Sequence, residues 1–188
     1  MTEKFDVAML VGSLRQNSYS GRVANALIKL APPELSLKIL PIGGLPFYNQ
    51  DLEAAPPAEW VAFRQAIAAT SGVLFVTPEY NRSVPGVLKN AIDVASRPGK
   101  SSVFNGKPAA VVSQSPGLLG GFGANHHLRQ SLVSMNMPAM QAPEAYISRS
   151  GTLFDDSGAL TNQTTAAFLT TFLQAFAAWI ALITKPKG

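Results

Sequence analysis

The sequence feature that most constrains the fold is a short apolar run that ends in a proline, Gly72 to Val76 followed by Thr77 and Pro78. Its shortness and its Val and Phe content are typical of a strand buried on both faces of a parallel sheet. Pro78 has no N–H to donate to a sheet and biases Thr77 toward an extended conformation, so the strand should end there. Residues 79–84 are therefore expected to form a loop at the carboxyl edge of a central strand.

A helix is expected directly after this loop. Pro85 and Gly86 suit a first helical turn, and apolar residues recur through the next turns. They are Val87, Leu88, Ala91, Ile92, Val94 and Ala95. This apolar surface is broader than one helix face, which predicts that a second subunit covers part of it. Open α/β sheets bind ligands at this edge, so Tyr80 and the amides Asn81 and Asn90 mark a candidate site.

Another strand, loop and helix open the chain. Phe5 to Val11 is predicted to be a buried strand, and a helix is expected from about Gly21 to Leu30. The nine residues 12–20 between them contain three serines, a glycine and an arginine. Hydroxyls, backbone N–H groups and the helix dipole favour an anion here, and Arg15 adds a charged donor. A serine N-cap needs the same residue types, but the position after the first strand favours phosphate binding.

This first loop matches neither of two common phosphate-binding motifs. Gly12 has no glycine partner before Gly21, and the next expected strand ends without a carboxylate for a ribose, which excludes a dinucleotide fingerprint. The loop also lacks the Gly-Lys-Ser/Thr of a Walker loop. The phosphate of a mononucleotide, bound without a metal, remains.

The rest of the chain continues the alternation of strands and helices. Leu35, Leu37 and Ile39 alternate with polar residues, which indicates a half-exposed edge strand. Helices are expected at 59–69 and 127–135, strands at 109–113 and 144–148, a long loop at 114–125, and a last helix capped by Thr161 or Asn162. The pattern predicts one domain, residues 1–188, folded as a three-layer α/β sandwich. Its five-stranded parallel sheet should be flavodoxin-like, in the order 2-1-3-4-5.

Composition narrows the function. The chain has no cysteine, which excludes an iron–sulfur cluster and a cysteine nucleophile, so any redox chemistry needs a bound cofactor. The net charge of +4 comes from scattered residues, so a small anionic ligand is expected rather than nucleic acid. Only 14% of the residues are charged, a second indication of a homodimer or homotetramer.

Two other features are expected to carry no ligand. His126 and His127 are neighbours that would project about 100° apart on a helix, so no metal site is expected. Phe47 and Tyr48 are expected to pack rather than to bind. Residues 166–183 are apolar but interrupted by threonines and a glutamine, which predicts a buried helix and no membrane span. With no signal peptide at its start, the protein is expected to be cytoplasmic.

Three motifs occur in order along the chain. They are Gly12-Ser13-Leu14-Arg15 with Ser18, then Pro78-Glu79-Tyr80-Asn81 continuing through Pro85-Gly86 to Asp93, then Ser115-Pro116-Gly117 with Gly120-Gly121 and His127-Leu128-Arg129-Gln130. Together they resemble the NAD(P)H-dependent FMN reductase family, which includes bacterial chromate and quinone reductases. The resemblance covers most of the chain.

The resemblance implies an FMN enzyme that takes NADPH or NADH as co-substrate. Hydride would pass through flavin N5 to a small-molecule acceptor, such as a quinone, free flavin, an azo compound or chromate. The implied cofactor-binding residues are Ser13, Arg15, Ser18, Tyr19 and Ser20 for the phosphate, and Pro78, Glu79, Tyr80, Asn81, Ser115, Pro116 and Gly117 for the isoalloxazine. No side chain is needed as acid or base. Tyr80 and Asn81 are expected to shape the substrate site.

Some alternatives stay open. Gly123 and His126 stand where some relatives have an Arg and a Tyr that help to join a tetramer, so dimer and tetramer are both compatible. An electron-transfer flavodoxin or a non-catalytic FMN sensor would share the fold, although the basic charge and Arg15 favour an enzyme. The sequence does not choose between NADPH and NADH or identify the physiological acceptor.

Overall fold

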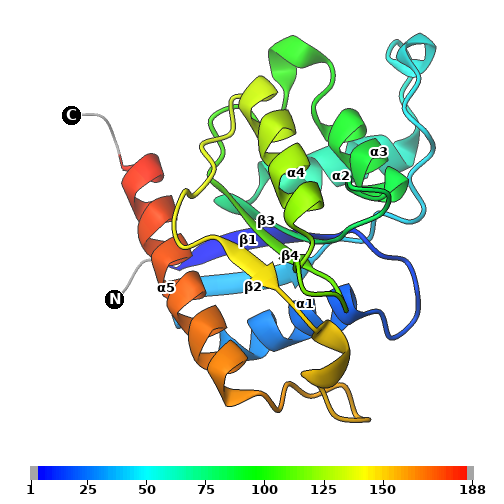
Figure 1. The fold of residues 1–188 in the computed structure, drawn as a ribbon. Helices are drawn as coiled ribbons and strands as arrows, with labels where there is room; N and C mark the ends of the chain where they lie inside the picture. Colours follow the sequence, from blue (N-terminus) through cyan, green and yellow to red (C-terminus); the bar gives the residue numbers. More distant parts are fainter. Residues whose placement is uncertain (1–3, 186–188) are drawn as a thin grey trace.

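The protein is described by a computed structural model that covers residues 4–185. Its centre is one parallel sheet of five strands (Figure 1). The strands are β1 (Phe5–Val11), β2 (Leu35–Ile39), β3 (Gly72–Pro78), β4 (Ala109–Gln114) and β5 (Ala145–Ile147). They lie in the order β2-β1-β3-β4-β5 and all pairs are parallel. The predicted flavodoxin-like order is confirmed.

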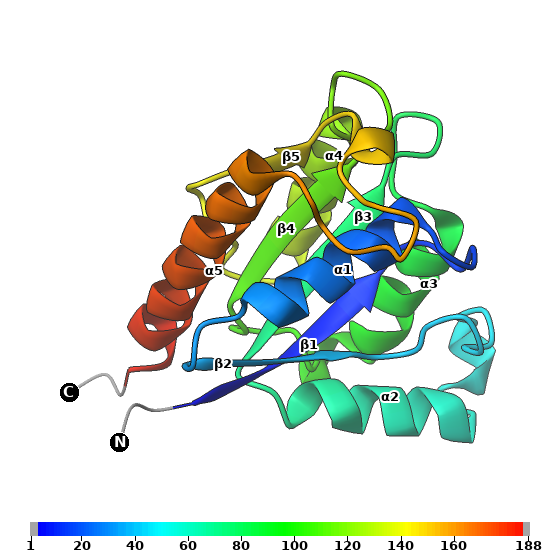
Figure 2. The same ribbon diagram turned by 90° about the horizontal axis from the view of Figure 1, so that it is seen from below.

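Helices cover both faces of this sheet, which confirms the three layers (Figure 2). One face carries α1 (Tyr19–Leu30) and α5 (Gln163–Thr184). The other carries α2 (Ala58–Ala68), α3 (Gly86–Ala95) and α4 (Phe122–Ser134). Short 3-10 segments occupy Gln50–Leu52, Gly99–Ser101 and Ser150–Thr152. Because all the strands run the same way, the loops after β1, β3 and β4 meet at one edge.

Side-chain alternation along the strands fills two separate cores. In β1, Val7 and Met9 face α1 and α5, whereas Ala8 and Leu10 face the other layer. Every residue of β3 and β4 is buried, as the continuous apolar run predicted. The last two residues of β2 are exposed, which agrees with its place at the sheet edge.

The helix α5 is long and apolar enough, by length and composition, to cross a membrane. In the folded chain it is a core helix, because one of its faces lies against the sheet. The buried residues of that face are Leu169, Phe172, Leu173, Phe176, Ala177 and Ile180. Asn162 caps the helix by accepting a hydrogen bond from the Thr165 N–H at 2.9 Å, so the second of the two predicted caps is the one used.

Two predicted helix starts were wrong. Helix α1 begins at Tyr19 instead of Gly21, because Ser18 caps it by accepting from the Gly21 N–H at 3.1 Å. Helix α4 begins at Phe122, five residues before the predicted start, so the loop predicted at 114–125 is shorter. Its glycines hid this start: Gly121 has a φ of +77° and precedes the helix without a side-chain cap of its own.

The reason given for a second subunit at α3 was also wrong. Most of the apolar surface of this helix is buried within the same chain, between the sheet and neighbouring segments that include α2. The buried positions are Leu88, Ala91, Ile92, Val94 and Ala95, and Val87 is half-buried. A helix between a sheet and another helix is covered on two sides by its own domain, so its apolar breadth says nothing about oligomers.

Candidate functional site

A cavity of about 320 Å³ lies at the carboxyl edge of the sheet, between the loops that follow β1, β3 and β4. Its lining residues are Ser13, Arg15, Ser18, Tyr19, Pro78, Glu79, Tyr80, Gln114, Ser115 and Pro116. All three sequence motifs contribute to this list. Residues about one hundred positions apart in the chain thus share one cavity.

The β1–α1 loop presents hydrogen-bond donors to this cavity. Within residues 4–185, the backbone N–H groups of Gln16, Tyr19 and Ser20 have no acceptor. The guanidinium of Arg15 lies 5.6 Å from the centre of the Tyr19 ring and makes no ion pair with a described carboxylate. Free N–H groups at a helix N-terminus beside a guanidinium are the donor set that a phosphate requires.

The loop after β3 is a small hairpin. Tyr80 and Ser83 exchange two backbone hydrogen bonds of 2.9 Å. Between them, Asn81 and Arg82 have φ values of 51° and 64°, as in a type I′ turn. The Tyr80 side chain is 51% exposed, so its ring is available to a ligand at the cavity mouth.

Two side chains fasten this hairpin to α4. Glu79 accepts a hydrogen bond from the Ala124 N–H at 3.1 Å and pairs with Arg82 at 3.2 Å. The Ser83 hydroxyl lies 2.6 Å from Nδ1 of His127. Glu79 therefore supplies the cap that the N-terminus of α4 lacks, and this contact also fixes the residue next to Tyr80.

The loop after β4 is held by the segment that follows β5. Ser115 donates its N–H to the Ile147 carbonyl at 3.0 Å and accepts from the Ser150 N–H at 3.1 Å. Its hydroxyl accepts from the Gly117 N–H at 3.0 Å, which closes a tight turn. The turn places Ser115 and Pro116 in the cavity wall.

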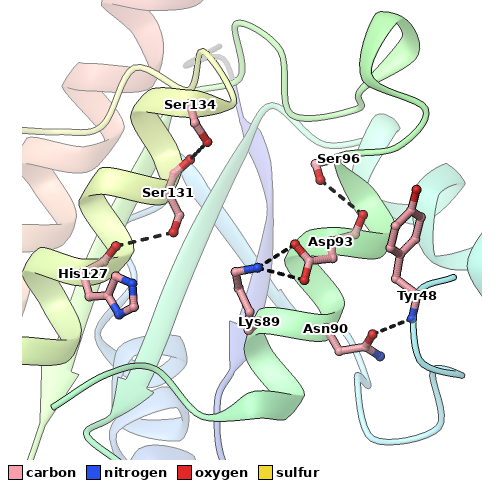
Figure 3. Close-up of polar contacts among 8 residues, drawn as sticks. All are labelled: Tyr48, Lys89, Asn90, Asp93, Ser96, His127, Ser131 and Ser134. Carbon is pink, nitrogen blue, oxygen red and sulfur yellow. Dashed lines mark hydrogen bonds and ion pairs between the residues drawn. The ribbon is translucent and has the colours of Figure 1, made fainter. Parts of the chain in front are cut away.

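Four predicted site residues lie elsewhere. Asn81 is exposed at the hairpin tip and Gly117 is exposed beyond the turn, so neither lines the cavity. Ser20 is fully buried, and its hydroxyl accepts a hydrogen bond from Gln114 at 2.9 Å. Asn90 has a structural role: its Oδ1 accepts from the Tyr48 N–H at 2.8 Å and so braces the loop after β2 (Figure 3).

Gln114 is the lining residue that the sequence analysis missed. It is 4% exposed and ends β4, with its side chain at the cavity. A polar residue at the carboxyl end of a buried strand was the available signal. The loop after β2 also differs from expectation, because Phe47 is 81% exposed, whereas Tyr48 packs on Trp60 at 5.6 Å as predicted.

The adjacent histidines have separate partners. Nε2 of His126 lies 2.9 Å from the Tyr146 hydroxyl, whereas His127 contacts Ser83. Burial, with a further contribution from Glu144, raises the pKa of Tyr146 to about 12, so the phenol stays protonated at neutral pH. Phe122 completes this group, with its ring centre 4.2 Å from that of His126.

A second cavity, of about 350 Å³, adjoins the first across Ser13, Arg15 and Ser18. Arg22 and Asp156 line it, so it carries charges of both signs. The loop on its far side is ordered by the Asp155 carboxylate, whose pKa is lowered by a hydrogen bond from the Ser157 hydroxyl and another from the Ala159 N–H.

The residues present fit FMN. The β1–α1 loop offers one cluster of phosphate donors, and the other two loops add prolines and an exposed aromatic ring beside it. A flat ring system joined to a single phosphate matches this division. A pyrophosphate would need a second cluster of donors of the fingerprint type.

Comparison with known proteins agrees with this site. The family model described as NADPH-dependent FMN reductase matches residues 5–152. A quinone reductase of Pseudomonas putida is 59% identical over 183 residues, which are 97% of this chain and 98% of that protein. A 2-hydroxy-1,4-benzoquinone reductase of a Burkholderia species is 44% identical over 174 residues, 93% of this chain and 95% of its own.

Among solved structures, the flavoenzyme NAD(P)H:(acceptor) oxidoreductase FerB of Paracoccus denitrificans superposes with a TM-score of 0.89 and 42% identity. The match covers 95% of this chain and 98% of that one. These findings confirm the resemblance seen in the three motifs. The chain belongs to the NADPH-dependent FMN reductase family and is an oxidoreductase that uses FMN with a nicotinamide nucleotide as electron donor.

Proposed function

We propose that this protein is a two-electron NAD(P)H:quinone oxidoreductase. The observation that carries the proposal is the cavity in which an anion-binding loop and two ring-binding loops meet. The names of the relatives support a quinone as acceptor, because a quinone reductase is 59% identical over nearly the whole chain. When bound, FMN supplies the redox chemistry, by accepting a hydride from the nicotinamide and passing it on.

The residues of this chain would hold and orient the cofactor. The Ser13 and Ser18 hydroxyls, the Arg15 guanidinium and the first N–H groups of α1 would bind the phosphate, with Tyr19 beside them. Ser20 would take part through its backbone N–H, because its hydroxyl already accepts from Gln114. The ring would lie against Pro78, Glu79, Tyr80, Ser115, Pro116 and Gly117.

The chain's further task would be to exclude water and set the approach of substrates. Tyr80 stands half-exposed on a hairpin that is fixed to α4, so its ring offers a rigid surface to a nicotinamide or quinone. Asn81 would act at the outer rim of the same hairpin. No acid or base from the protein is required, because the hydride acceptor is the cofactor.

The direct test is anaerobic oxidation of NADPH and of NADH by the purified holoenzyme with a benzoquinone. We expect steady turnover with one quinone consumed per nucleotide, and no one-electron reduction of added cytochrome c. An electron-transfer flavodoxin or an FMN sensor would not turn over NADPH, and that result would contradict the proposal. Free flavin, an azo dye and chromate, compared by kcat/KM, would rank below the quinone.

We also propose a cytoplasmic homodimer or homotetramer. Three large apolar side chains on or just after the loop that follows β4 are exposed: Leu118 at 69%, Leu119 at 61% and Phe122 at 51%. Such a patch beside a cofactor site is more typical of a subunit contact than of a free surface. Light scattering at micromolar concentration should give at least twice the chain mass, and Leu118→Arg with Leu119→Arg should lower it. A monomer mass for the wild type would contradict the oligomer.

A further inference from the structure

Three buried polar side chains form a bridge beneath the cavity. Nε2 of Gln114 donates to the Ser20 hydroxyl at 2.9 Å, and Oε1 of Gln114 accepts from the Ser150 hydroxyl at 2.7 Å. Ser20 and Ser150 are fully buried and Gln114 is 4% exposed. We call these three residues the Gln114 bridge.

The bridge interrupts an otherwise apolar face of β4. Ala110 and Val112, which point the same way as Gln114, belong to the core under α1 and α5. A buried amide is costly unless both its donor and its acceptor are paired, and here each end of the amide has a partner. An apolar side chain could fill this position, so packing alone does not explain a glutamine.

The bridge connects the two halves of the cofactor site. Ser20 lies in the first turn of α1, whose N–H groups form the phosphate-binding end. Gln114 directly precedes Ser115, and Ser150 also donates its N–H to the Ser115 carbonyl at 3.1 Å. The bridge thus joins the phosphate-binding helix to the ring-binding turn through hydrogen bonds of side chains alone.

We infer that Gln114 is a positioning residue that fixes the spacing between the phosphate end and the ring end of the site, an inference that rests on the proposed placement of FMN. A rigid two-part ligand gains full affinity only if both parts of its site are held at the matching distance beforehand. Without the bridge, α1 and the Ser115 turn are free to shift relative to each other. FMN then loses part of the contribution of its phosphate, whereas riboflavin, which has no phosphate, loses little.

The test compares the dissociation constants of FMN and riboflavin for the apoprotein, measured by quenching of flavin fluorescence. Gln114→Met keeps the volume and removes both hydrogen bonds, and we expect the ratio of the riboflavin to the FMN constant to fall about tenfold. Ser150→Ala removes one bond and should lower the ratio about threefold. The ratio reports on spacing, and a general loss of stability would weaken both ligands alike.

Ser113→Ala is the matched control. Ser113 is a fully buried serine that accepts a hydrogen bond from a buried amide, Asn125, at 3.2 Å, but on the opposite face of β4. It should leave the ratio unchanged even if it lowers the melting temperature as much as Ser150→Ala does.

An unchanged ratio in Gln114→Met would overturn the inference, as would an equal fall in Ser113→Ala. If Gln114→Met does not fold, the result with Ser150→Ala decides in the same way. A wild type that binds FMN no better than riboflavin would also overturn it. Failure of the proposed function is distinguishable, because a protein that does not oxidise NADPH would still yield both dissociation constants.

Discussion

The loops after β1 and β3 border the same cavity but are built in opposite ways. The β1–α1 loop leaves backbone N–H groups and a guanidinium without partners in residues 4–185. The hairpin after β3 satisfies its own backbone between Tyr80 and Ser83 and is fastened to α4 by Glu79. One loop is therefore suited to receive charge and the other to present a fixed surface.

This difference predicts different outcomes when a side chain is removed. In the β1–α1 loop the lost contact is a charged hydrogen bond to the ligand, so affinity should fall. In the hairpin the ligand keeps its phosphate contacts, so rate should fall more than affinity.

The largest effect is expected for Arg15→Ala. Loss of the guanidinium should weaken FMN binding by about 1.5–3 kcal/mol, the range for a hydrogen bond to a charged group. A titration followed by flavin fluorescence quenching measures this loss. Lys29→Ala removes a charge from the last turn of the same helix and should leave the affinity unchanged. Equal affinities for Arg15→Ala and the wild type would remove Arg15 from the site.

Tyr80→Ala should affect rate instead of binding. The phosphate contacts remain, so FMN should stay bound. A ligand displaced by about 1 Å, however, can lose on the order of 10²-fold in rate. Stopped-flow measurement of flavin reduction by NADPH and of reoxidation by a quinone should show at least one slower half-reaction. Tyr80→Phe, which keeps the ring, should be close to wild type. Unchanged rates in Tyr80→Ala would make this ring a packing residue and break the comparison.

Glu79→Ala should act on stability. It removes the cap on the Ala124 N–H, which should lower the free energy of unfolding by about 1 kcal/mol in urea denaturation. Glu79→Gln keeps an acceptor for this N–H and loses only the ion pair with the exposed Arg82, so its effect should be smaller. If both variants lose the same amount, the ion pair and not the cap is what matters.

The smallest effect concerns the loop beside the phosphate end of the site. The hydrogen bond from Ser157, followed by that from Ala159, lowers the pKa of Asp155 in the folded chain. A depressed folded-state pKa adds stability at pH values above the unfolded value of about 3.9. That stability is lost as the pH falls through the lowered pKa. Thermal unfolding should therefore separate Asp155→Ala from wild type at pH 6 and bring the two together below about pH 3. A gap that does not change with pH would exclude this linkage.

The sequence alone was sufficient for the architecture. The unbroken apolar run of β3, the half-exposed β2 and the alternation of strands with helices predicted the layers and the strand order. It also located the three loops of the site, because a phosphate-binding loop and a proline that ends a strand are local patterns. These features depend on residues close together in the chain, so periodicity and composition record them.

The tertiary structure decided what lies between the loops. The start of α4 depends on Glu79, which is 45 residues away from Ala124, and the role of Asn90 depends on Tyr48, 42 residues away. Gln114 meets Ser20 across 94 residues, a contact that no local pattern announces. Whether α3 needed a second subunit was likewise set by which segments of its own chain cover it. A single sequence gives the preference of each segment, whereas these contacts exist only once the sheet brings distant segments to the same edge.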